Sequence, residues 1–508
     1  MYTVLPEKFH IHEKTKYDKF IHISRFLQKF IYVETSVRQC LRQIETSQPQ
    51  EVEIRLKILK GIYMKAIFIK EAFKNMKIAV YYKLFAAALA ILSVLLICRG
   101  SAFHKPDRRR AMDQTHKTTV TVWVWGEDFN MTAVREAAAV YQKREPDVSF
   151  EMLLMTQEEI EARLKSLLVT GSHRLLPDLV LIADYRIPYF LHNYKDEFLP
   201  LGDLIDLSEY ALCKTGVNQI EGVVYGVPFD SGAAGLFYRL DLIRQAGFRE
   251  QDMQDLTWEQ YIRIGKKVKA KTGKAMLACN PADPALIRML LLRAGSWYTD
   301  VSGRLDLAGN TVMEEAMRLY QKIVQSGITL TVADWNQFTH AFWEGEVATV
   351  MTGSWITASI SRREQQKGLW RMTSVPRQEA DLSASASAAG GSGWYIFRYA
   401  DGAQQAKQFL AQTFASDQKL LADLTEKIGL VSAWNPAHRH AVYQKTQPFY
   451  GNQKIYQDLI RWTNEIPQVN YGAHTYEAEL IVADALQQVL DGQDIPKVLA
   501  HYQKKYEW

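Results

Sequence analysis

A run of 15 apolar residues, Leu84 to Cys98, lies inside this 508-residue chain rather than at its start. A helix that crosses a bilayer needs about 20 apolar residues, so the run is short for a stable span. It matches the hydrophobic segment of an export signal, which Lys77 and Lys83 would precede as the positive charges. Met76 is in position to start such a signal. We therefore predict a signal peptide or membrane anchor at residues 76–98, and a body that folds outside the cytoplasm.

The end of the apolar run is consistent with two modes of membrane attachment. Cys98 stands where bacterial lipoproteins carry their lipid-modified cysteine. Leu95 suits the position three residues before it, but Ile97 stands where a small residue is usual. The alternative is an uncleaved helix of about 20 residues, from Ile78 to Cys98. We favour lipid modification of Cys98 and keep the retained helix as its rival.

Charge divides the chain at the same place. Residues 1–97 hold 16 Lys and Arg against 8 Asp and Glu, a net charge of +8, whereas the remainder has 45 basic and 48 acidic residues. The exported part is nearly neutral, which predicts no nucleic-acid-binding surface. Residues 1–75 are either a cytoplasmic extension or the result of a start assigned too far upstream. Residues 99–117 are predicted to be a tether, and its basic cluster at 105–110 to be solvated rather than bound to lipid.

The remaining residues, 118–508, are long enough for two domains, because a single core stops growing beyond about 250–300 residues. Residues 119–125 alternate valine with threonine and tryptophan, which predicts a strand. A helix is expected from near Thr132 and must end before Pro146. Residues 179–183 are continuously apolar, as in a strand of a parallel sheet that is covered on both faces. Strands that alternate with helices indicate an α/β fold.

Two capping boxes predict where further helices begin. Residues 257–260 (TWEQ) start a helix that ends near Gly273, and residues 311–314 (TVME) start one that ends at Gly327. Strands are also expected at 348–351 and 394–397, and helices at 406–414 and from near Asp494.

Residues 382–393 (LSASASAAGGSG) form a low-complexity stretch within this pattern. One interpretation is a flexible linker. We favour a connection between domains whose backbone lines a cleft, because a strand from Trp394 follows the glycines at once. Cys213 and Cys279 have no C-x-x-C spacing, which argues against a metal or redox motif. They are either one disulfide or two buried thiols.

Acidic side chains follow two of the predicted strands. Glu127 and Asp128 come after residues 119–125, and Asp184 with Tyr185 comes after residues 179–183. Ligands of parallel sheets lie beyond the C-terminal ends of the strands, and carboxylates there can accept the paired hydroxyl hydrogen bonds that a sugar requires. For Asp128 a helix-capping role is an equally good interpretation. No capping box follows Asp184, which favours a ligand contact there.

Three tryptophans stand after small residues rather than within periodic apolar runs. Trp297 follows Ala-Gly-Ser, Trp355 follows Thr-Gly-Ser, and Trp394 follows Gly393. A ring in such a place offers the flat apolar face on which a pyranose stacks. Each one taken alone is as consistent with a core position. The three together favour carbohydrate binding.

The sequence contains no H-E-x-x-H, G-x-S-x-G or Walker A motif. A glycosidase requires two carboxylates that flank the scissile bond, and the acids from which such a pair would come are Glu127, Asp128, Asp184 and Asp230. We expect a binding protein rather than an enzyme, with no metal and no cofactor. A carbohydrate-active hydrolase is the alternative.

Eight segments of the chain carry a resemblance to a known family. They are TVWVWGEDFN at 121–130, PDLVLIADY at 177–185, VYGVPFDSGAAGLFYRLDLI at 224–243, LTWEQYIRIGKKVKAKTG at 256–273, AGSWY at 294–298, WEGEVATVMTGSW at 343–355, GGSGWYIF at 390–397 and VNYGAHTYEAE at 469–479. In this order and spacing, residues 118 to about 505 resemble the extracellular solute-binding proteins of ABC importers, of the maltose and multiple-sugar type. Each segment alone is weakly diagnostic, whereas the whole set is specific. Ile97 and residues 1–75 depart from the pattern.

The resemblance implies a two-lobed α/β fold of the periplasmic-binding-protein kind, with a hinge and a cleft between the lobes. Lobe 1 would comprise residues 118–230 and 391–447, and lobe 2 residues 231–390 and 448–508. The hinge crossings would lie near residues 228–232 and 390–396. Matching positions imply sugar contacts from Trp125, Glu127, Asp128, Asp184, Tyr185, Asp230, Ser231, Trp297, Trp355, Gly391, Ser392 and Tyr471. The alternative for Asp230 is a bond to the hinge backbone. The alternative for Tyr471 is packing between helices.

The implied function is that of the substrate-binding component of an ABC-type sugar importer. Such a protein captures a mono- or oligosaccharide between its lobes and delivers it to permease subunits, while other subunits hydrolyse ATP. We expect an exported monomer, anchored at the outer face of the membrane through Cys98 or an uncleaved helix. A membrane-anchored sugar sensor is a further alternative, which predicts that residues 84–98 persist in the mature protein.

Overall fold

Residues 118–378 and 386–506 are described by the computed structural model of the chain. The predicted signal at 76–98, its Cys98 and the 1–75 extension lie outside these residues. Within the described ranges, none of the helices combines the length and the apolar character needed to cross a membrane. These ranges build two five-stranded sheets and one two-stranded ribbon, β4 (Gln219–Ile220) with β5 (Val223–Val224).

The first sheet contains both strands that the sequence predicted early in the body. Its strands are β1 (Thr118–Val124), β2 (Val148–Leu154), β3 (Leu179–Ala183), β6 (Gly226–Asp230) and β12 (Ser392–Ile396), in the order β2-β1-β3-β12-β6. The strands β1, β2 and β3 are parallel, whereas β12 runs antiparallel to both of its neighbours. All five residues of the central strand β3 are buried, as its continuous apolar sequence predicts.

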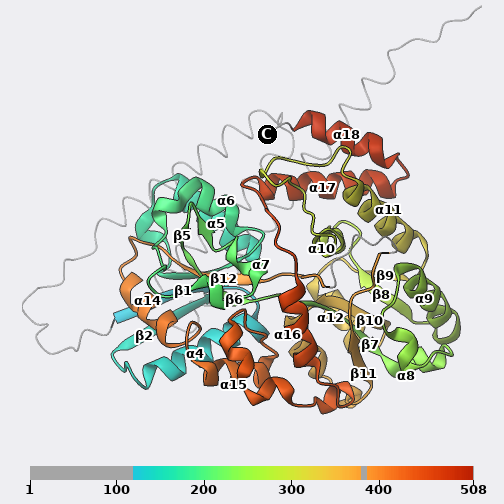
Figure 1. The fold of residues 1–508 in the computed structure, drawn as a ribbon, viewed down its shortest axis with the longest axis horizontal. Coiled ribbons are helices and arrows are strands. Elements are labelled where there is room, and N and C mark those ends of the chain that lie inside the picture. Colours follow the sequence, from blue (N-terminus) through green and yellow to red (C-terminus); the bar gives the residue numbers. More distant parts are fainter. Residues whose placement is uncertain (1–117, 379–385, 507–508) are drawn as a thin grey trace, which may run out of the picture. The chain divides into compact units, whose positions relative to one another are not determined.

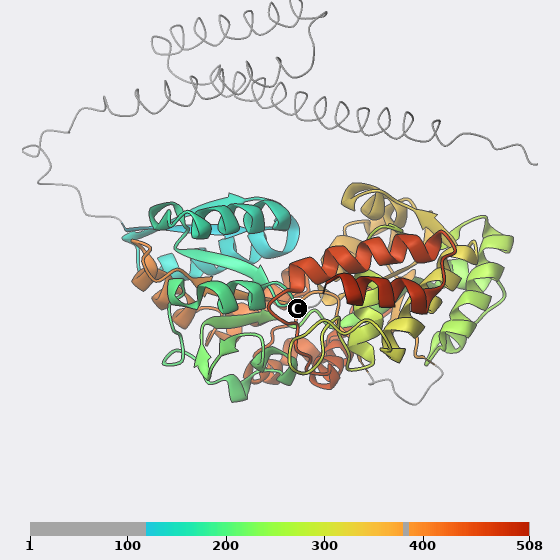
Figure 2. The same ribbon diagram turned by 90° about the horizontal axis from the view of Figure 1, so that it is seen from above.

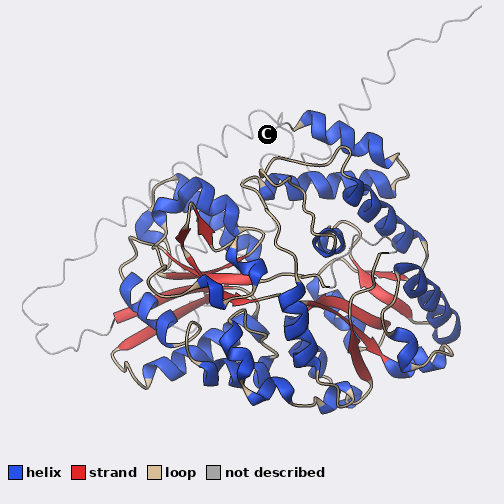
Figure 3. Ribbon diagram, in the orientation of Figure 1, coloured by secondary structure: helices blue, strands red, loops and turns tan. Residues whose placement is uncertain are grey.

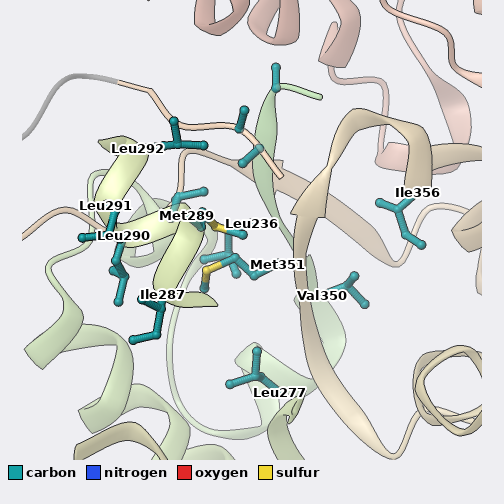
Figure 4. Packing of buried hydrophobic residues seen from close by; sticks show 14 of the residues in the cluster. Leu236, Leu277, Ile287, Met289, Leu290, Leu291, Leu292, Val350, Met351 and Ile356 are labelled. Atoms are coloured by element: carbon teal, nitrogen blue, oxygen red, sulfur yellow. The ribbon is translucent and has the colours of Figure 1, made fainter. Parts of the chain in front are cut away.

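The second sheet is assembled from later parts of the chain. Its strands are β7 (Ala234–Arg239), β8 (Ala275–Cys279), β9 (Thr329–Thr331), β10 (Val347–Gly353) and β11 (Trp370–Thr373), in the order β11-β7-β10-β8-β9. The helix α10 (Ala285–Arg293) packs on this sheet, and Met289 lies close to Leu236 of β7 and Met351 of β10 (Figure 4). Both sheets are mixed rather than wholly parallel, because β10 runs antiparallel to β7 and β12 antiparallel to β3.

Helices surround both sheets, and we name the two parts lobe 1 and lobe 2 by the residue ranges predicted above (Figures 1 and 3). The helices of lobe 1 are α4 (Thr132–Gln142), α5 (Gln157–Val169), α6 (Ile187–Tyr194), α7 (Leu212–Thr215), α14 (Ala403–Gln412) and α15 (Gln418–Ile428). Those of lobe 2, besides α10, are α8 (Leu240–Gln245), α9 (Trp258–Thr272), α11 (Thr311–Gln325), α12 (Trp335–Trp343), α13 (Thr357–Ser361), α16 (Ile455–Glu465), α17 (Thr475–Leu490) and α18 (Ile495–Lys505). Figure 2 shows α17 and α18 side by side at the end of the chain.

One of the two predicted capping boxes is confirmed. At the other helix, the capping residue lies one position earlier than predicted. At α9, the Thr257 hydroxyl accepts from the Gln260 amide while the Gln260 side chain accepts from the Thr257 amide, and Gly273 ends the helix at φ 70°. At α11, the capping residue is Asn310 rather than Thr311, because the Asn310 side chain accepts from the Met313 amide. Asparagine caps helices at least as well as threonine, so the preceding residue takes the role.

Two chain crossings join the sheets and lie against each other. Strand β6 leads into β7 through residues 231–233, and residues 386–391 lead back into β12. The Ala389 amide donates to the Gly232 carbonyl at 2.8 Å, and the Asp184 amide to the Gly391 carbonyl at 3.0 Å. Gly391 has φ 103°, and a Cβ there would lie 2.3 Å from a carboxyl oxygen of Asp184. The close backbone approach predicted for the glycine-rich stretch is therefore confirmed for its described part.

The apolar core extends across the boundary between the lobes. One cluster lies within lobe 1 and contains Val122, Phe229 and Trp394. The other fills lobe 2 and continues into lobe 1 through residues such as Ile182 and Phe190. The partly buried rings of Trp125 and Trp355 pack against both clusters. These two tryptophans therefore lie where the lobes meet.

Candidate functional site

The C-terminal end of β1 places the first predicted site residues at the boundary between the lobes. Trp125 is half-buried and Glu127 is exposed. Asp128 forms an ion pair with Arg362, which follows α13 in lobe 2. Glu127 and Asp128 lie in the first turn of a short π-helix at Glu127–Met131, whose N-cap position is Gly126. The capping interpretation of Asp128 thus does not hold, and its carboxylate instead connects the two lobes.

The end of β3 directs Asp184 inward, to a lysine that the sequence analysis did not single out. Both Asp184 carboxyl oxygens lie 2.5 Å from Nζ of Lys214, which is 0% exposed. The same ammonium donates to the carbonyls of Asp230 and Ser392, each at 2.9 Å. The Ser392 hydroxyl donates to the Asp230 carboxylate at 2.5 Å. We call Asp184, Lys214, Asp230 and Ser392 the hinge network.

The hinge network is enclosed by protein, so its two carboxylates are shielded from water. Burial raises the pKa of Asp184 to about 6 even though Lys214 opposes the rise. Burial likewise raises the pKa of Asp230. Beside the network, the hydroxyls of Ser231 and Thr463 are 2.7 Å apart, which ties the first crossing to α16. Four predicted sugar contacts, Asp184, Asp230, Ser231 and Ser392, therefore bond to the chain itself.

Tyr185, directly after Asp184, lies between guanidinium groups from the two lobes. The guanidinium of Arg186 lies 4.7 Å from its ring centroid, and that of Arg288 on α10 lies 5.1 Å from it on the lobe 2 side. Glu161 of α5 lies 3.6 Å from Arg186, and Glu479 of α17 is paired with Arg288. Guanidinium groups over an aromatic ring are attracted by its negative face. We call Glu161, Tyr185, Arg186, Arg288, Tyr298 and Glu479 the interlobe cluster.

Several buried polar atoms of the interlobe cluster have no hydrogen-bond partner among the described residues. They are Nε and Nη1 of Arg186, the hydroxyl of Tyr298 and Oε2 of Glu479. Buried polar atoms are normally paired, and leaving one unpaired costs about 1–3 kcal/mol. Donors and an acceptor from both lobes are thus gathered in one buried cluster. A ligand with hydroxyl groups is able to satisfy both kinds.

Lobe 2 contributes a pair of indole rings beside the second crossing. Trp355 is half-buried, and its Nε1 donates to the Ala389 carbonyl at 2.8 Å. Trp335, at the start of α12, lies 5.6 Å from Trp355 between ring centroids and is 51% exposed. By contrast, Trp394 is fully buried in lobe 1, stacked on Phe414. Of the three tryptophans chosen from the sequence, Trp394 is thus a core residue.

The rings of Trp297 and Tyr471 meet, and Tyr471 lies close enough to Asp184 and Tyr185 to interact electrostatically with both. The Trp297 and Tyr471 rings pack edge to face with centroids 4.7 Å apart, and both line a cavity of about 650 Å³. The cavity is bounded by α6 and residues 216–220 of lobe 1, and by residues 295–306 and 468–471 of lobe 2. Trp297 is only 2% exposed, and its Nε1 has no partner among the described residues. Tyr471 thus packs on Trp297 and lines the cavity, while its predicted role as a sugar contact stays a prediction.

The described residues contain no cluster of histidine, cysteine or acidic side chains that would hold a metal ion. Cys213 and Cys279 are free thiols, so the disulfide alternative does not hold. The residues of the site that escaped the sequence analysis include Lys214, Trp335 and five members of the interlobe cluster, namely Glu161, Arg186, Arg288, Tyr298 and Glu479. Arg288 did carry a signal, since it is a lone charge in the apolar sequence ALIRMLLL, where an unpaired guanidinium is costly. Lys214 carried none, because its partner is 30 residues away.

Comparison with known proteins agrees with this architecture. A family model for bacterial extracellular solute-binding proteins matches residues 136–448. The lactose-binding protein of Rhizobium radiobacter is 34% identical over 414 residues, which are 82% of this chain and 95% of that protein. An arabinooligosaccharide-binding protein of Halalkalibacterium halodurans is 23% identical and aligns with 67% of this chain and 77% of its own length.

Solved structures give the same fold at lower identity. The GacH receptor of Streptomyces glaucescens superposes with a TM-score of 0.65 at 19% identity, over 77% of this chain and 97% of that one. The ABC transporter associated binding protein from B. animalis subsp. lactis Bl-04 gives a TM-score of 0.65 at 19% identity, over 76% of this chain and 96% of that one. Family match, relatives and fold coincide over the two lobes. The chain therefore belongs to the family of bacterial extracellular solute-binding proteins.

Proposed function

We propose that this protein is the sugar-binding component of an ABC-type importer, which captures an oligosaccharide between its lobes and delivers it to permease subunits in the membrane. The relative that is 34% identical is named as a lactose-binding protein, and the alignment covers 95% of its length. Two further relatives are named for arabinooligosaccharides. In this proposal the chain itself carries out no chemistry, and hydrolysis of ATP belongs to other subunits.

The observation that carries the proposal is the interlobe cluster, with Tyr185 between Arg186 of lobe 1 and Arg288 of lobe 2. A sugar hydroxyl both donates and accepts, so it matches a buried cluster in which Nη1 of Arg186 is an unpaired donor and Oε2 of Glu479 an unpaired acceptor. A ligand that contacts both lobes binds their closed arrangement better than an open one. Only that difference in affinity shifts the population towards closure.

Around this cluster we propose Trp125, Glu127, Tyr185, Trp355 and Trp335 as sugar contacts, because each lies at least partly exposed near the lobe boundary. Trp297 and Tyr471 are proposed to contact the ligand through the cavity that they line. Gly391 provides close backbone approach at the crossing. The hinge network and Ser231 are proposed to order the hinge rather than to touch sugar, since their polar atoms bond to the chain.

Calorimetric titration of the full chain with lactose, an arabinotriose, glutamate and a tripeptide tests the proposal. We expect one of the sugars to bind and to raise Tm, because a ligand that binds only the folded state stabilises it. Trp355→Ala should weaken the affinity about tenfold, which corresponds to about 1.4 kcal/mol. Trp434→Phe is the matched control, since Trp434 lies in lobe 1 and donates to Glu209 away from the cluster. Sugars that leave Tm unchanged while glutamate or the tripeptide raises it would contradict the proposal, and sugar hydrolysis seen by chromatography would favour the hydrolase.

Attachment to the outer face of the membrane is proposed as well, through lipid on Cys98 or a retained helix at 78–98. These residues lie outside the described part of the chain. Mass analysis of the N-terminus after extraction from membranes separates the two modes. A diacylglyceryl adduct on Cys98 identifies a lipoprotein, whereas an intact 84–98 segment without the adduct identifies the anchor helix and favours the sensor alternative.

A further inference from the structure

The first turn of α17 in lobe 2 places an aromatic ring among residues of lobe 1. Tyr476 packs edge to face on Tyr189 of α6, with centroids 5.1 Å apart and planes at 80°. It also lies edge to face with Phe190, at 6.1 Å and 90°. Phe190, on α6 of lobe 1, is 0% exposed and belongs to the apolar cluster that crosses the boundary between the lobes. The ring of Tyr476 is therefore packed against a fixed surface of the other lobe.

Two cations of lobe 1 face the same ring. Nζ of Lys165, on α5, lies 3.0 Å from the centroid of Tyr476, and the guanidinium of Arg186 lies 4.4 Å from it. Cations over the face of a tyrosine ring are attracted by its quadrupole, and more strongly where water is excluded. Tyr476 is thus held by edge contacts to two aromatic rings and by face contacts to two cations, all from lobe 1.

The preceding residue adds a hydrogen bond between the lobes. The hydroxyl of Thr475 donates to the carbonyl of Tyr185 at 2.6 Å, and Thr475 is 0% exposed. The acceptor is a backbone atom directly after β3, so the bond fixes α17 to the end of a strand of the first sheet. These contacts join protein to protein and require no ligand.

From this arrangement we propose that Thr475 and Tyr476 form a clasp, which holds the lobes in the arrangement described here, with α17 against α6, before any sugar binds. The inference rests on the proposed function, because it assigns the clasp the control of sugar affinity. Any motion that separates α17 from α6 breaks the ring contacts and the Thr475 hydrogen bond together. The apparent dissociation constant of a ligand varies inversely with the fraction of protein in the competent state. Loss of the clasp therefore weakens binding without removing any sugar contact.

Small-angle X-ray scattering of the sugar-free full chain and titration with lactose test the clasp together. Tyr476→Ala should expand the sugar-free protein and weaken lactose binding about tenfold. Thr475→Val, which keeps the shape of the side chain but removes the donor, should act in the same direction and less strongly. Tyr476→Phe keeps the ring contacts and loses only the hydroxyl beside Glu161, so it should retain most of the compactness and lactose affinity of the wild type. Tyr399→Ala is the matched control, because this tyrosine of lobe 1 is 60% exposed and its ring contact is with His173 rather than with a residue of the clasp.

The two readouts separate failure of the clasp from failure of the proposed function. Expansion of the sugar-free Tyr476→Ala protein supports the clasp even if the wild type binds no lactose. Unchanged scattering with unchanged affinity overturns it. Unchanged scattering with weaker lactose binding also overturns it, because Tyr476 would then act as a direct sugar contact. If circular dichroism shows that Tyr476→Ala does not fold, the scattering of Thr475→Val decides, and no expansion there contradicts the clasp.

Discussion

Asp184 shows how far the position of a single residue decides its role. Its place after a buried strand predicts a carboxylate at the ligand-binding edge of the sheet. In the structure that carboxylate turns inward and meets Lys214, whose ammonium also binds the carbonyls of Asp230 and Ser392. A buried charge is tolerated only when it is paired and fully hydrogen-bonded. The pair is therefore expected to matter for folding and for the shape of the hinge.

Replacement of Asp184 by asparagine should reduce the free energy of unfolding by about 3–5 kcal/mol, because it leaves a buried ammonium without its counter-charge. Urea denaturation followed by tryptophan fluorescence measures the loss. The double variant Asp184→Asn/Lys214→Met should recover most of it, since neither charge then remains buried. An Asp184→Asn protein with full stability but much weaker sugar binding would instead restore Asp184 to the predicted ligand contacts.

Among the elements, the helices that begin at strong local signals were predictable. The capping box at Thr257 is present as the sequence indicates, and Gly273 and Gly327 both adopt the positive φ of a helix C-terminus. The start of α11 differs because two good capping residues, Asn310 and Thr311, stand next to each other. The hydrogen bond from the Met313 amide selects Asn310. Local signals thus locate the start of a helix to within one residue when two adjacent residues can both cap it.

The choice of Asn310 over Thr311 as the capping residue of α11 can be tested by substitution. Asn310→Ala should cost about 1 kcal/mol of the free energy of unfolding, the usual cost of losing an N-cap side chain. Thr311→Ala should change stability by less than about 0.5 kcal/mol, because Thr311 is exposed and makes no cap hydrogen bond. The two variants are compared by urea denaturation under the same conditions. A larger loss for Thr311→Ala than for Asn310→Ala would show that the sequence-based start was right.

At the scale of the whole molecule, the lobes are connected by contacts between residues that are far apart in sequence. Thr475 bonds to Tyr185, and Asp128 pairs with Arg362. The α/β class and the strands at 119–125 and 179–183 were predicted from local periodicity, and the paired hinge crossings from the resemblance to the solute-binding family. The partners of Tyr185 across the boundary were not, since the lone charge of Arg288 in an apolar run does not tell which ring it meets, and no local pattern identifies Thr475.

The sequence by itself determined the elements, their assembly into two α/β lobes and the family, because hydrophobic period, capping residues and ordered motifs are properties of neighbouring residues. Only the tertiary structure decided which polar and aromatic groups face a ligand and which bond to the chain. It buried Trp394 in a core and Asp184 against Lys214, yet left Trp335 half exposed beside Trp355. The reason is physical: hydrogen bonds, ion pairs and ring contacts depend on distance in space, which the topology of two sheets sets for residues hundreds of positions apart.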